Sequence, residues 1–392
     1  MTVDVIGIGE ADVPAAARAL IEGADVLVGG ERHLALIGFG PAQRHVWPKP
    51  FAKAKALLDG LGDARIVVLA SGDPMWFGVG ATLMRWFGPD KVRIHPHPGA
   101  FSLAAARMGW ALHETQCLSA HGRPIEALRV HLAPGRKWLV LAEDGETASR
   151  LARLLAWAGY GPSIITVLSH LDGPLEATKS DNALNWQGNT PDLSVLAVSL
   201  AAQPGRALTP LVAGLPDAAF EHDGQLTKRV IRAATLSALA PLPGLLLWDV
   251  GAGSGSVAIE WMRAGGQAVA IEADPVRAAR IARNALSLGV PDLEIVEATA
   301  PDGLPSGAPD AIFVGGGVSD DGLLVRCWER LKPGGRMVAN AVTLESEAAL
   351  IAFFQAHGGE LVRLSYAHLD AVGDYHAWAS ARPVTQYSGV KA

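Results

Sequence analysis

The chain has 392 residues, of which 49% are hydrophobic and 18% charged, and its formal net charge is −6 at pH 7. This length predicts two domains with sizeable cores, and the acidic balance argues against a general affinity for nucleic acid. The two cysteines lie far apart and form no C-x-x-C pair, which favours a reducing compartment and argues against a disulfide framework or a cysteine-built metal site.

The amino end enters an apolar strand without a basic leader or a long apolar segment. No apolar run approaches the ~20 residues that a membrane span requires, so we expect a cytoplasmic protein without a membrane partner. The predicted strands at residues 2–6, 24–28, 65–69 and 92–95 alternate with helices at 14–22, 53–61 and 79–87. This alternation favours a mostly parallel sheet with ligand loops at the carboxyl ends of its strands.

Three unusual turns fall at those carboxyl ends and could line one cleft. They are residues 7–9, 70–75 and 98–102. Gly7 and Gly9 would let a ligand approach the backbone closely. Asp73 could contact a ligand or only stabilise its own turn, and Ser102 could be no more than a helix cap.

A second lobe follows the first. Its predicted elements are strands at 116–118, 138–141, 163–167 and 194–198 and helices at 124–132 and 147–158. We therefore expect a two-lobed α/β module over residues 1–203, with lobes of about 1–112 and 113–203. The proline- and glycine-rich stretch 204–220 is the clearest linker, and a separate α/β domain fills residues 221–392.

The carboxyl-terminal domain is organised around an apolar strand, a glycine turn and a helix start at Leu245–Glu260. Gly251, Gly253 and Gly255 permit a tight turn, and the free N–H groups of the helix start would face a ligand. Glu272 ends the next predicted strand and could accept both ribose hydroxyls of an adenosine. The G-x-G-x-G spacing differs from the G-x-G-x-x-G of dinucleotide binders, and the turn could also be merely structural.

The rest of this domain continues the alternation, and its strands end in polar or glycine-rich loops. The predicted helices are 227–239, 274–288, 323–331 and 345–355, and the further strands are 294–297, 310–314 and 336–341. Residues 360–367 and 377–383 could pair as a final antiparallel ribbon. The binding edge of the sheet is therefore the edge where these loops lie.

Several motifs resemble those of known families. The glycine turn, Glu272, the turn at 332–335 and the terminal strand pair resemble Rossmann-like S-adenosylmethionine (SAM)-dependent methyltransferases. Residues 226–229, 298–301 and 310–317 look like the corrinoid-pathway branch that methylates C15 and decarboxylates a side chain. Residues 5–9, 70–74 and 98–102 are similar to the tetrapyrrole methylases, which clamp SAM between two lobes.

In this order the two halves resemble the precorrin-6B C5,15-methyltransferase (decarboxylating) family of cobalamin biosynthesis. The resemblance implies that the amino-terminal module methylates C5. The carboxyl-terminal module would methylate C15 and release the ring C (C12) acetate as CO2, giving precorrin-8X. It also implies a tetrapyrrole partner and a homo-oligomer. The loop at residues 10–14 is shorter than expected for the family, so the substrate entrance could differ.

The resemblance implies SAM as cofactor in both modules. The amino-terminal cofactor residues would be Gly7, Gly9, Ser71, Gly72, Asp73, Gly99, Ala100 and Ser102. The carboxyl-terminal ones would be Thr227, Gly251, Ala252, Gly253, Ser254, Gly255, Glu272 and Ala300. Thr227 could instead belong to a capped, solvent-facing helix start. Decarboxylation requires a proton donor, for which Tyr375 and His376 are the catalytic candidates and His368 a further one, although each could be a packed ribbon residue.

An acidic tetrapyrrole also requires cations near the binding edges. The candidates are Arg32, His33, Lys49, Arg229, Arg232 and Arg336. His95 and His97 look like a pair of metal ligands, but no third ligand is near them in the sequence, and we predict no metal.

Three alternatives stay open. SAM could serve another acceptor, a nucleic acid or a protein, which a basic face would favour. The chain could be a binding protein that senses SAM or a tetrapyrrole, which tight binding without turnover would reveal. A nicotinamide oxidoreductase is the third alternative, and the glycine spacing speaks against it.

Overall fold

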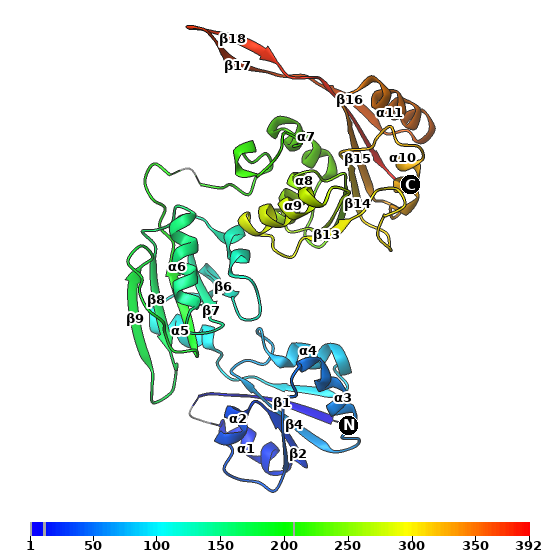
Figure 1. The fold of residues 1–392 in the computed structure, drawn as a ribbon. Helices are drawn as coiled ribbons and strands as arrows, with labels where there is room; N and C mark the ends of the chain where they lie inside the picture. Colours follow the sequence, from blue (N-terminus) through cyan, green and yellow to red (C-terminus); the bar gives the residue numbers. More distant parts are fainter. Residues whose placement is uncertain (1, 11–12, 207) are drawn as a thin grey trace. The chain divides into compact units, whose positions relative to one another are not determined.

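The computed structural model describes residues 2–10, 13–206 and 208–392. It divides into two compact units (Figure 1), of which unit 1 comprises Met1–Ile125 and Leu132–Ala207 and unit 2 comprises Glu126–His131 and Leu208–Ala392. Residues 11 and 12 of the loop expected to be short, and residue 207 of the expected linker, lie outside the described residues. Among the described residues, no helix is both long and apolar enough to cross a membrane.

The first sheet of unit 1 is parallel throughout, as predicted, with the strand order β3-β2-β4-β1-β5. Its strands are β1 (Thr2–Ile8), β2 (Val26–Gly29), β3 (Gln43–Val46), β4 (Arg65–Ser71) and β5 (Val92–His95). The accompanying helices are α1 (Ala15–Glu22), α2 (Glu31–Leu36), η1 (Phe51–Lys53), α3 (Ala54–Asp59) and α4 (Val79–Phe87). The sequence did not predict α2, which is short, or β3, which is an edge strand without a fully buried residue.

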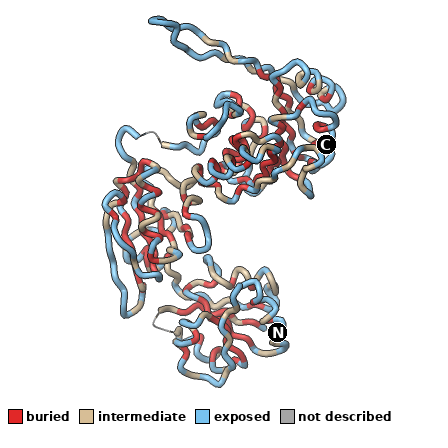
Figure 2. The backbone as a smooth tube through the Cα atoms, in the orientation of Figure 1, coloured by how far each residue is buried: buried red, intermediate tan, exposed pale blue. Residues whose placement is uncertain are grey.

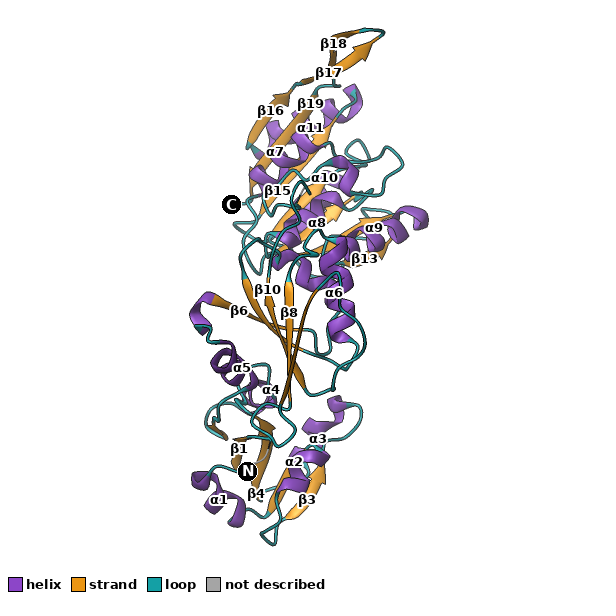
Figure 3. Cartoon of the chain, turned by 90° about the vertical axis from the view of Figure 1, so that its left-hand side faces the viewer, coloured by secondary structure: helices purple, strands orange, loops and turns teal. Residues whose placement is uncertain are grey.

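The second sheet of unit 1 is mixed (Figure 3), with the order β6-β7-β10-β8-β9 and one parallel pair, β6 with β7. Its strands are β6 (Thr115–Ser119), β7 (Lys137–Leu141), β8 (Ile164–Ser169), β9 (Ala177–Asn182) and β10 (Ser194–Ser199). The helices are α5 (Ala100–Met108), η2 (Leu112–Glu114) and α6 (Thr147–Trp157). Helix α5 packs Phe101 and Ala104 into the core of this sheet beside Leu139 and Leu168. The turn at residues 98–102 therefore connects the two lobes.

The segment expected to be an α-helix at residues 124–132 is instead the 3₁₀-helix η3 (Ile125–His131). Most of it belongs to unit 2. Val130 packs against the core of that unit, and the Arg129 guanidinium donates a hydrogen bond to the Ser287 carbonyl. A short piece of the amino-terminal half of the sequence is thus built into the carboxyl-terminal unit.

Unit 2 is a seven-stranded sheet with helices on both faces, in the order β13-β12-β11-β14-β15-β19-β16. Its strands are β11 (Leu246–Val250), β12 (Gln267–Glu272), β13 (Glu294–Glu297), β14 (Ala311–Val314), β15 (Arg336–Ala341), β16 (Glu360–Leu364) and β19 (Val384–Val390). The helices are η4 (Asp217–Ala219), α7 (Arg229–Leu239), α8 (Ser256–Arg263), α9 (Pro275–Ser287), α10 (Leu323–Arg330) and α11 (Leu344–His357). Helices α7, α8 and α9 share one core, and α10 and α11 share the other. The strand order reverses at β11, the position where open α/β sheets bind ligands.

The predicted final ribbon pairs differently. Strand β16 pairs with β19 inside the main sheet, with Glu360 opposite Ser388. The ribbon is formed by β17 (Ala367–Val372) and β18 (Tyr375–Ser380), which pair with each other alone. Figures 1 and 2 show this hairpin projecting from unit 2 with an almost wholly exposed surface.

Candidate active sites

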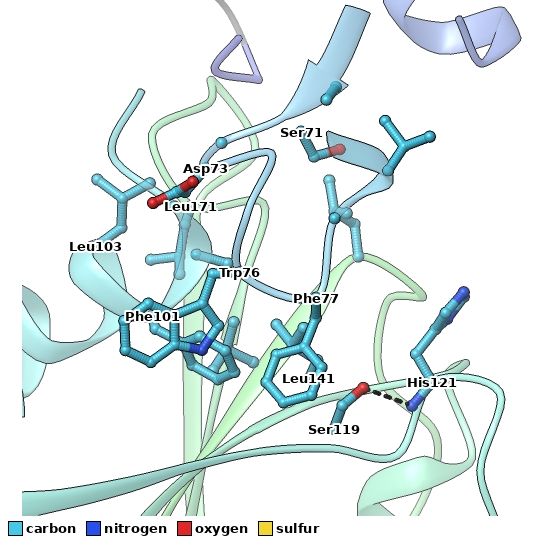
Figure 4. Close-up of a pocket in the computed structure, with 18 of the residues that line it drawn as sticks. Ser71, Asp73, Trp76, Phe77, Phe101, Leu103, Ser119, His121, Leu141 and Leu171 are labelled. Carbon is cyan, nitrogen blue, oxygen red and sulfur yellow. Dashed lines mark hydrogen bonds between the residues drawn. The ribbon is translucent and has the colours of Figure 1, made fainter. Parts of the chain in front are cut away.

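A pocket of about 700 Å³ lies in unit 1, and the three predicted turns line it together. Residues 8–9, 70–73 and 98–102 form its walls on the side of the parallel sheet. Ser119, His121 and Leu141 line it from the second sheet (Figure 4). The expectation that the three turns share one cleft is thus confirmed. The contribution of the second sheet was missed, because no motif marks those residues.

The glycines of these turns have a packing role that does not depend on a ligand. A Cβ atom on Gly7 would lie 1.9 Å from the carbonyl oxygen of Gly72. Gly72 has a φ of +53°, and a Cβ atom there would lie 2.5 Å from the Cα atom of Gly99. At both places the added Cβ atom would collide with backbone atoms of the neighbouring turn. Only glycine therefore lets the turns approach each other and form the pocket wall.

Asp73 stabilises its own turn, because its Oδ1 atom accepts a hydrogen bond of 2.9 Å from the Met75 N–H. Ser102 lines the pocket, but it does not cap α5, whose N-cap is Gly99 without a side-chain hydrogen bond. Gly99, Ala100 and Ser102 thus lie at a helix start that faces the pocket, where free N–H groups can bind a ligand. The cofactor role of all these residues stays a prediction.

One wall of the pocket carries a polar cluster formed by Arg32, His33 and Ser71. The Ser71 Oγ atom lies 2.9 Å from His33 Nε2 and 3.3 Å from Arg32 Nη2. Burial, followed by the charge of Arg32, lowers the pKa of His33 to about 4. At neutral pH the cluster therefore carries the single positive charge of Arg32.

Aromatic side chains form another part of the pocket lining, which the sequence reading missed. The Trp76 and Phe77 rings have centroids 5.9 Å and 6.0 Å from the Phe101 ring. Trp76 is 51% exposed and Phe77 is 50% exposed. Figure 4 shows the three rings grouped together, with Ser71 apart from them. Two adjacent aromatic residues, separated from Gly-Asp-Pro only by Met75, were the available signal, because large exposed apolar groups often mark a binding surface.

A polar contact joins the two lobes of unit 1 beside this pocket. Glu10 follows β1 and lines the pocket, and its Oε1 atom lies 2.7 Å from Nδ1 of His170, which follows β8. His95 is likewise paired, with its Nε2 atom 2.8 Å from Asp4 Oδ1. Within the described ranges, no three His, Cys, Asp or Glu side chains are grouped as a metal site would require.

The second candidate site is the glycine turn between β11 and α8 in unit 2. Gly251, Gly253 and Gly255 all adopt left-handed φ values, of +70°, +60° and +74°. A Cβ atom on Gly251 would lie 2.8 Å from the Gly316 nitrogen, and one on Gly255 would lie 2.7 Å from Ile281 Cγ2. The turn therefore needs its glycines for backbone conformation and for close packing, Gly251 against the loop after β14 and Gly255 against α9.

Glu272 lies at the end of β12 and holds this turn in place. Its Oε2 atom accepts a hydrogen bond of 2.7 Å from the Gly253 N–H, and Oε1 accepts one of 3.1 Å from the Asp274 N–H. An ionised carboxylate has about four lone-pair sites, so acceptor capacity remains for ribose hydroxyls. The sequence predicted the residue but not its contact with the turn.

Asp249 lies in β11, separated from Gly251 by Val250, the last residue of the strand, and was not predicted as a site residue. It is 1% exposed, and its Oδ2 atom accepts a hydrogen bond of 2.9 Å from the Ala258 N–H. Its buried Oδ1 atom has no hydrogen-bond partner among the described residues. Burial, with a smaller contribution from the charge of Glu272, raises the pKa of Asp249 to about 7.

The remaining predicted residues of unit 2 differ in their surroundings. Arg232, a candidate for binding substrate carboxylates, is instead fully buried and donates a hydrogen bond of 2.7 Å to Glu260 Oε1. It also donates to the Thr227 carbonyl, so Thr227 lies on a segment fixed by this arginine. Ala300 packs at the edge of the second core. Tyr375, which is 80% exposed, and His376 lie on the projecting hairpin, away from α8 in Figures 1 and 3.

Two family models match the chain. The model described as Tetrapyrrole (Corrin/Porphyrin) Methylases matches residues 5–171, and the one described as Precorrin methyltransferase domain matches residues 218–391. A Sinorhizobium sp protein named precorrin-6Y C(5,15)-methyltransferase (decarboxylating) is 47% identical, over 99% of this chain and 96% of its own length. A Mycobacterium tuberculosis protein of the same name is 42% identical over 95% of both chains.

The chain belongs to the precorrin-6Y C(5,15)-methyltransferase (decarboxylating) family. Among solved structures, the C-terminal domain of a precorrin-6Y C5,15-methyltransferase from Rhodobacter capsulatus is 46% identical, covers 47% of this chain and all of its own, and has a TM-score of 0.44. The two family models and the full-length relatives confirm the family resemblance inferred from the motifs, and the observed sheets confirm the fold class. As a member of this family, the chain is a methyltransferase enzyme.

Proposed function

We propose that the chain is a bifunctional SAM-dependent C-methyltransferase that acts on a precorrin-6 macrocycle. The macrocycle is the precorrin-6B expected from the sequence and the precorrin-6Y of the relatives' names. Unit 1 methylates C5, and unit 2 methylates C15 with loss of the ring C (C12) acetate as CO2, giving precorrin-8X. The observation that supports two activities is the presence of two separate glycine-built sites in one chain whose full-length relatives are named for both reactions.

The residues of both sites fit SAM. In unit 2 the cradle is a turn that Cβ atoms would fill, with Glu272 placed to accept ribose hydroxyls and the Asp249 Oδ1 atom without a partner among the described residues. In unit 1 the helix start at Gly99–Ser102 and the turn at Asp73 face a pocket that is large enough for a cofactor together with part of a substrate. When bound, SAM supplies a methyl group activated by its sulfonium.

For methyl transfer, the chain has to align the acceptor carbon and exclude water. Alignment of two reactants can lower the barrier by up to ~7–11 kcal/mol. The pocket of unit 1 is suited to this task, since Leu103, Leu141 and Leu171 line it together with the aromatic rings. A reduced tetrapyrrole is an electron-rich carbon nucleophile, so no strong protein base is needed.

Decarboxylation leaves an electron pair that the conjugated macrocycle can delocalise, and a proton must then reach the carbon that lost CO2. Tyr375, His376 and His368 remain the proposed donors. All three lie on the exposed hairpin, so within one chain they are remote from the glycine turn. A homo-oligomer, expected from the resemblance, would give this hairpin a partner. Sedimentation velocity of the full chain tests that expectation.

The deciding experiment is the product mass after incubation of the full chain with the precorrin-6 substrate and excess SAM. Two methyl gains with loss of one CO2 support both assignments. One methyl gain together with CO2 loss leaves unit 1 without the proposed activity. An unchanged substrate, with SAM bound, overturns the tetrapyrrole assignment.

A cytoplasmic location stays a prediction, which fractionation of the producing cell tests.

A further inference from the structure

The pocket of unit 1 concentrates guanidinium groups although the chain as a whole is acidic. Arg32 on α2, Arg85 on α4 and Arg123 after β6 all line it. Over residues 2–10, 13–206 and 208–392, the recorded ion pairs include none of these three arginines. By contrast, Arg107 in the same unit forms a two-point ion pair with Glu176. The arginines of the pocket are therefore available to an anionic ligand.

Each acidic side chain of the pocket has a recorded partner other than these arginines. Glu10 contacts His170 at 2.7 Å. Asp73 accepts a hydrogen bond from its own turn, and Asp192 accepts one of 2.9 Å from the Gly145 N–H. These carboxylates keep their charge, but among the described residues none of them forms a recorded ion pair with Arg32, Arg85 or Arg123. A ligand that carries carboxylates would pair with the arginines directly.

Arg32 is the arginine whose orientation is best defined. Its Nη2 atom donates to Ser71 Oγ at 3.3 Å, and the Ser71 hydroxyl can in turn donate to His33 Nε2 at 2.9 Å. This direction requires a neutral His33, which its pKa of about 4 ensures at neutral pH. A guanidinium has five N–H donors in a fixed fork, so most of those on Arg32 remain for a ligand.

The aromatic group Trp76, Phe77 and Phe101 lies apart from Ser71, the residue of this cluster that Figure 4 labels. Aromatic faces provide a broad apolar contact for a flat ring system, whereas a guanidinium binds a carboxylate through two parallel hydrogen bonds. A macrocycle with acidic arms needs both kinds of surface in one pocket.

We propose that Arg32, oriented by Ser71 and His33, binds a carboxylate arm of the tetrapyrrole in unit 1. Arg32 is thus a positioning residue: it fixes the rotation of the macrocycle over the aromatic group and thereby selects the carbon presented for methylation. This inference rests on the proposed function, because it requires a tetrapyrrole with acidic side arms as substrate.

The test compares R32Q and R32K with R93Q in the full chain. Arg93 is an exposed residue of β5 and serves as the matched control. R32Q is expected to raise KM for the macrocycle in C5 methylation by ~10- to 100-fold, because a charge-assisted pair is lost. R32K should recover part of this loss, since lysine keeps the charge but not the fork. C15 methylation with CO2 loss, which belongs to unit 2, should match R93Q in both variants and report intact folding.

Equal KM values for R32Q and R93Q, in a preparation whose unsubstituted chain methylates C5, would overturn the inference. If the unsubstituted chain does not methylate C5, the proposed function fails, and binding then decides about Arg32. The probes are an octacarboxylate porphyrin and its octamethyl ester, followed by quenching of tryptophan fluorescence. R32Q must weaken binding of the acid while leaving binding of the ester unchanged; equal effects on both probes contradict the role of Arg32.

Discussion

Asp249 combines burial with an unpartnered oxygen, and this should make the stability of unit 2 depend on pH. Its pKa rises from 3.8 to about 7 on folding, first because of burial and second because of Glu272. Between these values the folded chain binds more protons than the unfolded chain, so the free energy of unfolding should fall as pH rises from about 4 to 7. The slope is at most ~1.4 kcal/mol per pH unit.

The measurement is urea unfolding at several pH values for the natural chain and for D249N. The asparagine cannot ionise, so the difference in unfolding free energy between the two proteins should change steadily across this window and become constant above it. A difference that is independent of pH would show that Asp249 is ionised in the folded chain throughout the window.

Glu272 should control the SAM site of unit 2 but not that of unit 1. E272Q removes the charge of the side chain that accepts the Gly253 N–H and that is proposed to bind the ribose. A hydrogen bond to a charged group contributes about 1.5–3 kcal/mol, so affinity at this site should fall by ~10- to 100-fold. Isothermal titration of the full chain should therefore show one tight SAM equivalent in place of two. The control E297Q, an exposed glutamate at the end of β13, should keep both.

At the scale of single residues, the sequence predicted where turns and strand ends lie better than it predicted which side chains or backbone groups contact one another. The glycine turns and Glu272 were placed correctly because their conformational requirements are local. The role of Gly7 as a backbone contact for Gly72 depends on two strands that meet only in the folded chain. The same holds for Arg232, which looked like a surface cation because its partner, Glu260, lies 28 residues away on another helix.

At the scale of elements, the pair of Arg232 on α7 and Glu260 on α8 should stabilise the contact between these helices and the segment before α7. Both side chains are buried, and Glu260 also accepts hydrogen bonds from the N–H groups of Gly214 and Leu215. R232A would leave a buried carboxylate without its cation, which costs about 3–5 kcal/mol. The control R283A breaks an ion pair with Glu221 whose side chains are 55% and 58% exposed, and it should cost at most ~1 kcal/mol.

Thermal unfolding followed by circular dichroism compares these two variants with the natural chain. A large drop in Tm is expected for R232A and a small one for R283A. Similar Tm values for the two variants would contradict the view that Arg232 is a structural cation, and would return it to the candidates for substrate binding.

Helices and strands with long hydrophobic runs were predicted well. Polar edge strands were missed, and the pairing of the last strands was predicted wrongly. Strand β9 consists of Ala177–Asn182, which are mostly exposed, so no alternation marks it. The ribbon was paired wrongly because β19 carries Thr385 and Gln386, which read as polar. Both are buried, and Gln386 bonds to Thr235 and Asn340 at 3.0 and 2.9 Å. Because this hydrogen-bond network joins residues far apart in the sequence, it cannot be inferred before the strands are placed in the sheet.

For the whole molecule, the least predictable feature is that residues 126–131 belong to unit 2. Sequence order places them in the amino-terminal half, and nothing in their composition indicates a partner some 160 positions later. The contact is made where α9 ends. Gly289 has a φ of +86°, and Arg129, the Glu126 carbonyl and Val130 surround the position that a Cβ atom would take there.

This arrangement predicts that G289A destabilises unit 2 in two ways. A left-handed φ costs an L-residue about 1–2 kcal/mol, and the new Cβ atom would also lie 2.8 Å from Arg129 Cβ and 3.2 Å from the Glu126 carbonyl oxygen. The control G307A shares a positive φ, +101°, but no other group lies within 4 Å of its Cβ position in the described structure. Urea unfolding should therefore show a larger loss for G289A, because only that variant forces η3 away from α9. Equal losses of unfolding free energy in the two variants would mean that residues 126–131 move away from α9 without a cost, and that they contribute little to the stability of the carboxyl-terminal unit.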